Sequence, residues 1–239
     1  MLMKRNIELL LLKLADGGRI LRMSRTKLRA ISGEATRFRI LAQTILAITM
    51  ACLWSAPGVA LGADKTEEGF VSLFDGKTLN GWHLMNGAKF VVEGGVIKHS
   101  VGRGWLRSDK EYADFNLRLE FRFMKPGQDG GVFLRAGAEG KDWPDRKYEV
   151  QVENTRRMAT IFGASHELNV ELVQKVLKPD GEWNEYDITI VGSKIEVRLN
   201  KQLVSSSNAA EALKRGYIGL QGEDGLHEYR HLRIRDLSK

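Results

Sequence analysis

The 239-residue sequence has one cysteine, Cys52, and lacks the short motifs that mark common catalytic sites. There is no Gly-x-Ser-x-Gly elbow, no phosphate-binding glycine loop and no His-Glu-x-x-His zinc motif. Strand–helix alternation, internal repeats and low-complexity segments are also missing, which argues against a Rossmann fold or an α/β barrel. Cys52 lies in an apolar segment that we expect to be removed, so disulfides and cysteine–zinc sites are excluded for the rest of the chain.

Residues 1–63 are typical of an N-terminal extension with a secretory signal peptide. Arg37 and Arg39 precede an apolar run over residues 40–54, and small residues follow as far as Ala63. This run is shorter than the roughly 20 apolar residues that a membrane-spanning helix needs. We therefore expect cleavage near Gly62 or Ala63 and export of residues 64–239 to the periplasm or the medium, without stable membrane insertion. An uncleaved anchor is the alternative; lipid attachment at Cys52 is another, although the preceding residues match a lipobox poorly.

The charge of the chain belongs to this leader. The formal net charge is +7, and residues 1–63 account for all of it with ten Lys and Arg against three Asp and Glu. The remaining 176 residues are therefore electrically balanced. Nucleic-acid binding, which needs a basic face on the folded part, is not expected.

Residues 64–239 show the pattern of many short strands. Residues 115–124 alternate apolar and polar side chains, as in a strand with one buried face. Residues 186–191 and 194–199 are joined by Gly192-Ser193, which predicts a hairpin. Further strands are expected near residues 132–135, 148–153, 217–221 and 228–235, and one helix near 167–176. The number and spacing of the strands predict an all-β jelly-roll sandwich of two antiparallel sheets.

Polar residues lie opposite the apolar set in several of these strands: Glu120, Arg122, Arg135, Glu149, Gln151 and Glu153. One interpretation is a solvated sheet face with cross-strand ion pairs. The other is a single concave sugar-binding surface, because carboxylates, amides and Arg bind hydroxyls and an aromatic ring stacks on the sugar. Candidates for the ring are Trp105, Tyr148 and Trp183.

An ordered set of motifs resembles the 3-keto-disaccharide hydrolase domain family, which has a concanavalin A-like jelly-roll fold. The set covers about residues 69–237 and begins with Leu-Phe-Asp-Gly-Lys-Thr-Leu-Asn-Gly-Trp at residues 73–82. It continues with Gly-Val-Phe-Leu-Arg at 131–135, Tyr-Glu-Val-Gln at 148–151, Gly-Glu-Trp-Asn at 181–184 and Tyr-Ile-Gly-Leu-Gln at 217–221. Departures from the family pattern include Asp129-Gly130, Glu223 and Phe162.

The resemblance implies an enzyme that cleaves glycosides oxidised to a ketone at C3. That ketone acidifies the C2 proton, so a carboxylate can remove it and the sugar at C1 can leave by elimination before water adds. From side-chain chemistry we expect Glu149 or Glu153 to be the base and Arg135 or Arg122 the electrostatic partner of the enolate. A divalent metal is possible in that second role, with no ligands assigned. The expected substrate-binding residues are Glu120, Arg122, Gln151, Trp105, Trp183, Gln221 and Glu223.

Two alternatives stay open, because a fold does not determine a function. The first alternative is a non-catalytic, lectin-like carbohydrate-binding domain. The second is a structural domain of the cell envelope. A carboxylate of raised pKa in a pocket would favour the enzyme.

Overall fold

The computed structural model describes residues 69–223 and 227–238, which all belong to the unit Lys65–Lys239. The expected leader, its cleavage site and Cys52 lie outside the described residues. Fifteen strands and one helix occur in the described part. No helix in it is long and apolar enough to cross a membrane.

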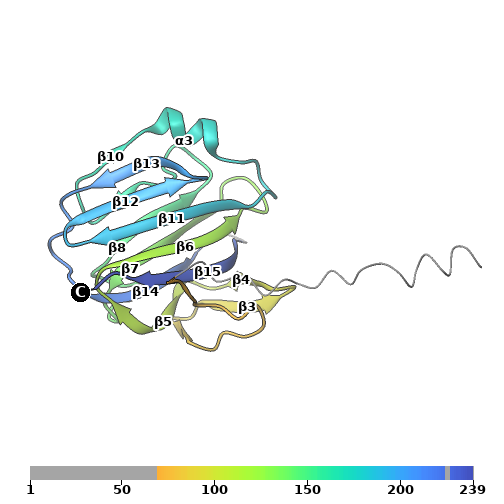
Figure 1. Cartoon of the computed structure of the whole chain (residues 1–239). Helices are drawn as coiled ribbons and strands as arrows, with labels where there is room; N and C mark the ends of the chain where they lie inside the picture. Colours follow the sequence, from red (N-terminus) through yellow and green to blue (C-terminus); the bar gives the residue numbers. More distant parts are fainter. Residues whose placement is uncertain (1–68, 224–226, 239) are drawn as a thin grey trace, which may run out of the picture. The chain divides into compact units, whose positions relative to one another are not determined.

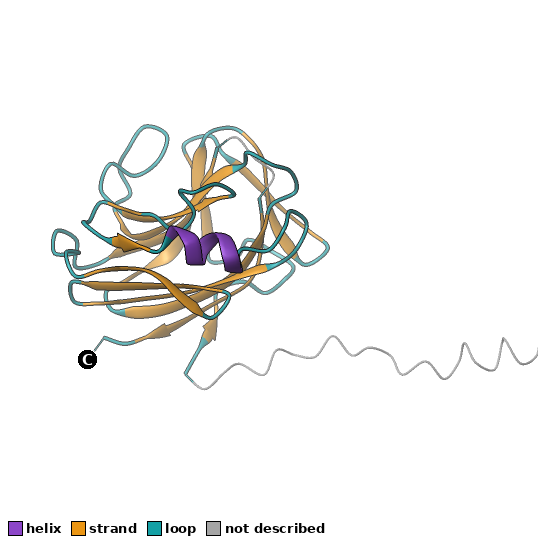
Figure 2. Ribbon diagram, turned by 90° about the horizontal axis from the view of Figure 1, so that it is seen from above, coloured by secondary structure: helices purple, strands orange, loops and turns teal. Residues whose placement is uncertain are grey.

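The strands form two antiparallel sheets that pack face to face (Figures 1 and 2). The nine-stranded sheet has the order β10 (Glu167–Leu168), β13 (Gln202–Ser207), β12 (Lys194–Leu199), β11 (Asn184–Val191), β6 (Phe115–Arg122), β15 (Glu228–Asp236), β4 (Val96–Val101) and β3 (Lys89–Glu93), with β1 (Val71–Ser72) paired to β15. The six-stranded sheet has the order β2 (Trp82–Met85), β5 (Gly104–Tyr112), β14 (Gly216–Gly222), β7 (Asp129–Ala136), β8 (Tyr148–Glu153) and β9 (Ile161–Phe162).

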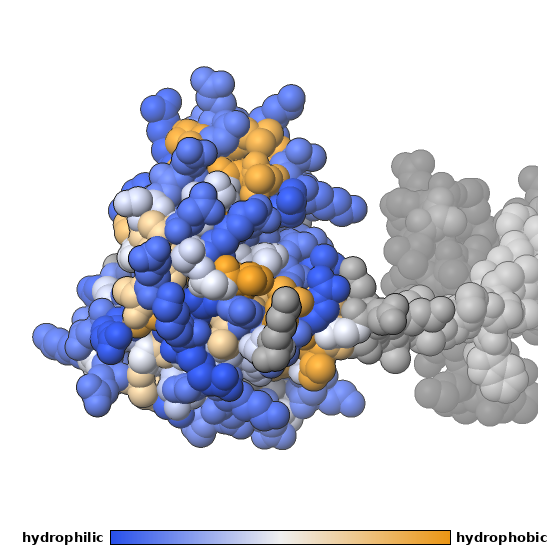
Figure 3. All heavy atoms as spheres, turned by 60° about the vertical axis from the view of Figure 1, so that its left-hand side comes forward, coloured by the Kyte–Doolittle hydropathy of each residue, from blue (hydrophilic) through white to orange (hydrophobic). Residues whose placement is uncertain are grey.

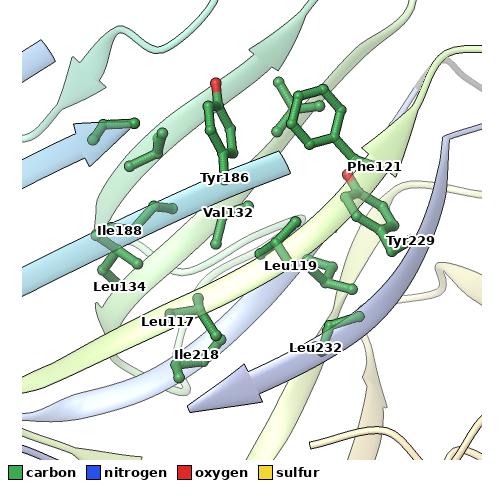
Figure 4. Close-up of a cluster of buried hydrophobic side chains, with 14 of the residues drawn as sticks. Leu117, Leu119, Phe121, Val132, Leu134, Tyr186, Ile188, Ile218, Tyr229 and Leu232 are labelled. Atoms are coloured by element: carbon green, nitrogen blue, oxygen red, sulfur yellow. The ribbon is translucent and has the colours of Figure 1, made fainter. Parts of the chain in front are cut away.

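The core lies between the sheets and follows from the alternation in each strand. Leu117, Leu119 and Phe121 of β6 point toward Val132 and Leu134 of β7, and all five are fully buried (Figure 4). Their partners in the same cluster come from β11, β14 and β15 (Figure 4). Burial of each such side chain contributes about 1.5–3 kcal/mol, which makes this layer the main stabilising element of the fold.

The hairpin and the helix occur where the sequence predicts them. β11 and β12 pair from Tyr186↔Leu199 to Val191↔Lys194 around the expected turn. The helix α3 covers only Val170–Val176 (Figure 2), because Asn169 caps it by accepting a hydrogen bond from the Leu172 amide at 3.0 Å. Residues 167–168, expected to be helical, instead pair with β13 as the edge strand β10.

The exterior is largely polar, as the balanced composition leads one to expect. Figure 3 shows one face covered mainly by hydrophilic residues, with hydrophobic residues in small separate groups. The outer face of the nine-stranded sheet carries cross-strand ion pairs such as Arg118 with Asp187 and Arg122 with Glu228. On this sheet the interpretation as a solvated face fits the contacts.

Candidate functional site

The candidate site lies on the outer face of the six-stranded sheet. In β7 and β8, Val132 and Val150 face each other across the strands and point into the core. Because side chains alternate, Gly131, Glu149 and Gln151 point to the opposite face. The same alternation in the neighbouring strands brings Gln221 of β14 and Trp105 of β5, which are paired with each other, to this face.

Gly131 is the floor on which two side chains converge. A Cβ atom at this position would lie 2.5 Å from Oε1 of Glu149 and 2.9 Å from Oε1 of Gln221. Any side chain here would displace one or both of them. The absence of a side chain at residue 131 therefore allows a carboxylate from β8 and an amide from β14 to meet over the central strand.

Glu149 is 8% exposed, and its charged form is disfavoured. Burial raises the pKa of Glu149 to about 7. Lys147, whose Nζ lies 3.7 Å from Oε2, lowers this pKa, whereas the negative charges of Asp129 and Glu223 raise it. A carboxylate with a pKa close to neutrality is suited to exchange protons with a substrate.

The two amides beside Glu149 are held in place by other carboxylates. Gln151 donates from Nε2 to Oδ1 of Asp129 at 2.6 Å and to Oε2 of Glu153 at 3.0 Å. Gln221 donates from Nε2 to Oε2 of Glu223 at 2.9 Å. The Oε1 atom of Gln221 is buried and has no hydrogen-bond partner in the described part of the chain. It is therefore an oriented acceptor beside Oε1 of Glu149.

Glu153 and Glu223, two further residues of the predicted set, form ion pairs at the edge of this surface. Glu153 receives the Arg157 guanidinium at 3.0 Å, and Glu223 is paired with Arg103. Glu153 thus lies on the same face as Glu149, but its carboxylate is engaged by Arg157, Gln151 and the Thr155 hydroxyl. Of the two carboxylates predicted as the base, Glu149 has the more suitable surroundings.

Trp105 lies on the same outer face but is covered by its neighbours. It is fully buried and packs edge-on against Phe133, with ring centres 5.8 Å apart. A Cβ atom on Gly219 would lie 2.5 Å from the Trp105 ring and 2.9 Å from the Phe133 ring, so the absence of a side chain at Gly219 leaves the room that both rings occupy. The predicted sugar-stacking role of Trp105 does not fit its burial, because no ring face is open.

Arg135 is not part of this surface, contrary to the prediction. The pairing of β14 with β7 shifts between Tyr217 and Gly219, and Arg135 has a left-handed φ of 47° at this irregularity. Its side chain, 1% exposed, donates to the carbonyls of Ala113, Gly192 and Leu213 and to Oδ1 of Asp114. The β-bulge turns the residue out of the alternation, and the guanidinium joins three loops.

Glu120, Arg122 and Trp183 also lie elsewhere, so the prediction of one surface shared with Glu149 is wrong for them. Glu120 and Arg122 are on β6 in the nine-stranded sheet and point away from its core side. The guanidinium carbons of Arg122 and Arg230 lie 4.6 Å and 4.0 Å from the Trp183 ring centre. Trp183, Glu120 and Arg230 line a separate groove of about 390 Å³. Tyr148, the remaining ring candidate, is buried on the core side.

Three residues of this face, Lys147, Asp129 and Phe162, were not among the predicted site residues, although Asp129 and Phe162 were noted as departures from the family pattern. Lys147 precedes Glu149 by two residues and Asp129 precedes Gly131 by two, so the same alternation could have identified both. Phe162 of β9 is directly opposite Glu149. Its two-residue strand has too few residues to show a period.

No metal ligands can be assigned from the described residues. Within residues 69–223 and 227–238, no group of three or more His, Cys, Asp or Glu side chains is arranged to hold an ion.

The two antiparallel sheets, packed face to face in this strand order, define the class of jelly-roll β-sandwich domains. The chain belongs to the 3-keto-alpha-glucoside-1,2-lyase-like domain family, whose pattern matches residues 69–235. The expected fold and family are confirmed.

Individual relatives agree with this assignment. A 3-keto-disaccharide hydrolase of Bacteroides thetaiotaomicron is 25% identical over 160 residues, which are 52% of this chain and 53% of the relative. The alignment thus spans about half of that protein's length. Two crystal structures of candidate glycosyl hydrolases from Parabacteroides distasonis are also similar. One has a TM-score of 0.59 at 19% identity and covers 72% of this chain and 95% of its own. The other has a TM-score of 0.58 at 25% identity and covers 70% and 99%.

Proposed function

We propose that the protein is an exported enzyme that cleaves 3-keto-disaccharides or related 3-keto-glycosides, with Glu149 as the general base. The observation that carries this proposal is the convergence of Glu149 and Gln221 over Gly131, with the Glu149 carboxylate buried and its pKa raised to about 7. The membership of the family and the name of the Bacteroides relative support the substrate class.

The proposed reaction begins at C2 of the oxidised sugar. Glu149 takes the C2 proton, and the electron pair of the broken C–H bond forms an enolate with the C3 ketone. The enolate re-forms the C3 ketone, a double bond forms between C1 and C2, and the bond from C1 to the bridging oxygen breaks. That oxygen takes the proton held by Glu149 and departs as a hydroxyl of the free second sugar. Addition of water, hydroxyl to C1 and hydrogen to C2, completes a net hydrolysis; release before this step gives a lyase.

The side chains around Glu149 suit the negative charge that develops on the enolate. The Lys147 ammonium, 3.7 Å from Oε2 of Glu149, is the cation nearest to the base and takes the electrostatic role that was predicted for Arg135 or Arg122. Gln221, whose Nε2 donates to Glu223, lies beside Glu149 over Gly131 and borders the position of the sugar. Gln151, which Asp129 and Glu153 hold, borders the same floor.

The lectin-like alternative is supported less well. A binding domain has no need of a buried carboxylate with a pKa near 7, whereas a base that removes a C2 proton does.

The proposal is tested with Glu149→Gln, because Gln has the shape of Glu but cannot accept the proton. Release of monosaccharide from a 3-keto disaccharide should fall by about 10²–10⁴-fold. Glu120→Gln on the other sheet is the matched control and should retain full activity. Exchange of the C2 proton for deuterium in D₂O, followed by NMR, should disappear in Glu149→Gln only. Normal cleavage by Glu149→Gln, or equal cleavage of the unoxidised disaccharide by the wild type, would refute this function.

Export is a separate part of the proposal and rests on the sequence of residues 1–63. Mass spectrometry of protein from the envelope fraction should give an N-terminus near Ala63 or Asp64. A mature protein that begins at Met1 or Met23 would overturn it.

A further inference from the structure

Phe162 is an exposed aromatic side chain beside the base. Among the described residues it is the one aromatic member of the exposed large hydrophobic set, with 41% of its surface accessible. It is paired directly with Glu149 across β8 and β9, whereas its neighbour Ile161 is paired with Val150 and buried. The Phe162 ring therefore emerges on the same face as Glu149.

The backbone places residue 162 beside β8. Gly163 follows with φ of 90°, and a Cβ atom on it would lie 2.6 Å from the Lys147 carbonyl oxygen. Glycine at residue 163 thus allows the chain to lie close to β8 where the pairing of β9 with β8 ends. Arg157, which pairs with Glu153, places its guanidinium carbon 5.9 Å from the Phe162 ring centre. An apolar ring is thus held at the rim among charged groups.

The position of Phe162 relative to the floor separates two subsites. Oε1 of Glu149 points toward Gly131 and Gln221, so the ring that loses its proton lies over β7. Phe162 lies on the other side of Glu149, because β9 is two strands from β7 in the sheet. Along the strands it is offset from Gly131 by two residues, since Gly131 pairs with Gln151 whereas Phe162 pairs with Glu149. With about 4.8 Å between strands and 3.4 Å per residue, Gly131 and Phe162 are about 12 Å apart. One pyranose ring cannot cover this distance, whereas two linked rings can.

We propose that Phe162 forms the aromatic wall of the leaving-group subsite and stacks on the second sugar of the substrate. The apolar C–H face of a pyranose matches an exposed aromatic ring, while its hydroxyls can reach the surrounding charged side chains. Phe162 is then a specificity-determining residue that favours 3-keto disaccharides over 3-keto glycosides with a small aglycone. This inference rests on the function proposed above.

The test measures kcat/KM of the full-length protein for two substrates, a 3-keto disaccharide and methyl 3-keto-glucoside. Phe162→Ala should lower kcat/KM for the disaccharide about 5- to 10-fold and change that for the methyl glycoside by less than about twofold. Phe162→Tyr, which keeps an aromatic ring, should retain the preference for the disaccharide over the methyl glycoside. Leu203→Ala is the matched control, because Leu203 is 40% exposed on β13 of the other sheet. Equal losses on both substrates, or none on either, would overturn the proposal.

Binding measurements test the role of Phe162 separately from the proposed enzymatic function. If the wild type cleaves neither substrate, the proposed function fails, and Kd values measured by titration calorimetry decide the role of Phe162. The wild type should then bind the disaccharide about 5- to 10-fold more tightly than Phe162→Ala does. Equal Kd values would show that Phe162 forms no sugar wall.

Discussion

Replacing Glu149 by Gln should stabilise the folded protein at neutral and alkaline pH while removing its activity. In the unfolded chain this carboxyl ionises near 4.5, whereas in the folded chain its pKa is about 7. Between these values the unfolded chain releases a proton that the folded chain keeps. The free energy of unfolding of the wild type therefore falls as the pH rises from about 4.5 to about 7 and is constant above that range.

The size of the effect follows from the two pKa values. One pKa unit corresponds to about 1.36 kcal/mol, so the penalty above pH 7 is about 3 kcal/mol. The attraction of Lys147 is already contained in the folded pKa of Glu149, so its loss is not subtracted a second time. Urea unfolding of Glu149→Gln should consequently show a gain of about 2–3 kcal/mol over the wild type at pH 8, and almost none at pH 4.

Glu120→Gln supplies a control of opposite sign. Burial would raise the pKa of Glu120, but hydrogen bonds and charges from His231 and Arg230 lower it below its ordinary value. Its ionised form therefore stabilises the fold at neutral pH, and this contribution is lost as the pH falls through the folded pKa. Glu120→Gln should be destabilised at pH 8. A gain for Glu149→Gln that is equal at pH 4 and pH 8 would refute the assignment of a buried carboxyl with a raised pKa.

Three further predictions follow from the contacts. Arg135→Ala should lower the free energy of unfolding by about 3–5 kcal/mol, seen as a clear fall in Tm, while activity per folded molecule stays normal; a loss of turnover without a loss of Tm would return Arg135 to the site. Gly131→Ala should keep its Tm within a few degrees but lower kcat/KM about 10²-fold, because the methyl group displaces the carboxylate of Glu149; unchanged kinetics would contradict the floor described here. Arg122→Ala should leave kcat/KM unchanged, since the residue is on the other sheet, and a tenfold loss would show that this sheet also binds substrate.

The kinetics of the wild type supply a last check. Since ionised Glu149 is the active base, kcat/KM should rise with pH through an apparent pKa of about 7 and then level off. A rate that is already maximal at pH 5 would assign the base to a different carboxylate.

The fold was predictable because alternation is a local property. Within β6, one period-2 pattern decides that Leu117 and Leu119 are buried and that Glu120 is not. The same pattern identified Glu149 and Gln151 as outward-facing, and the two-residue connection Gly192-Ser193 between two strands identified the hairpin turn. Each of these inferences concerns residues that are neighbours along one strand or across one short turn.

The location of the site depends on pairing between distant strands, which alternation does not contain. The outward faces of β6 and β8 look alike in the sequence, yet β6 pairs with β11 and β15 whereas β8 pairs with β7 and β9. This difference separates Glu120 from Glu149 and places them on different sheets.

What the sequence by itself determined is the fold class, the faces of the strands and the residue types available for chemistry. The tertiary structure decided which of them meet: the bulge that turns Arg135 into a structural residue, the convergence of Glu149 and Gln221 over Gly131, and the exposed ring of Phe162 beside them. The pKa of Glu149 belongs to this second group. It arises from burial and from charges on other strands, and these are set only when the sheets have assembled.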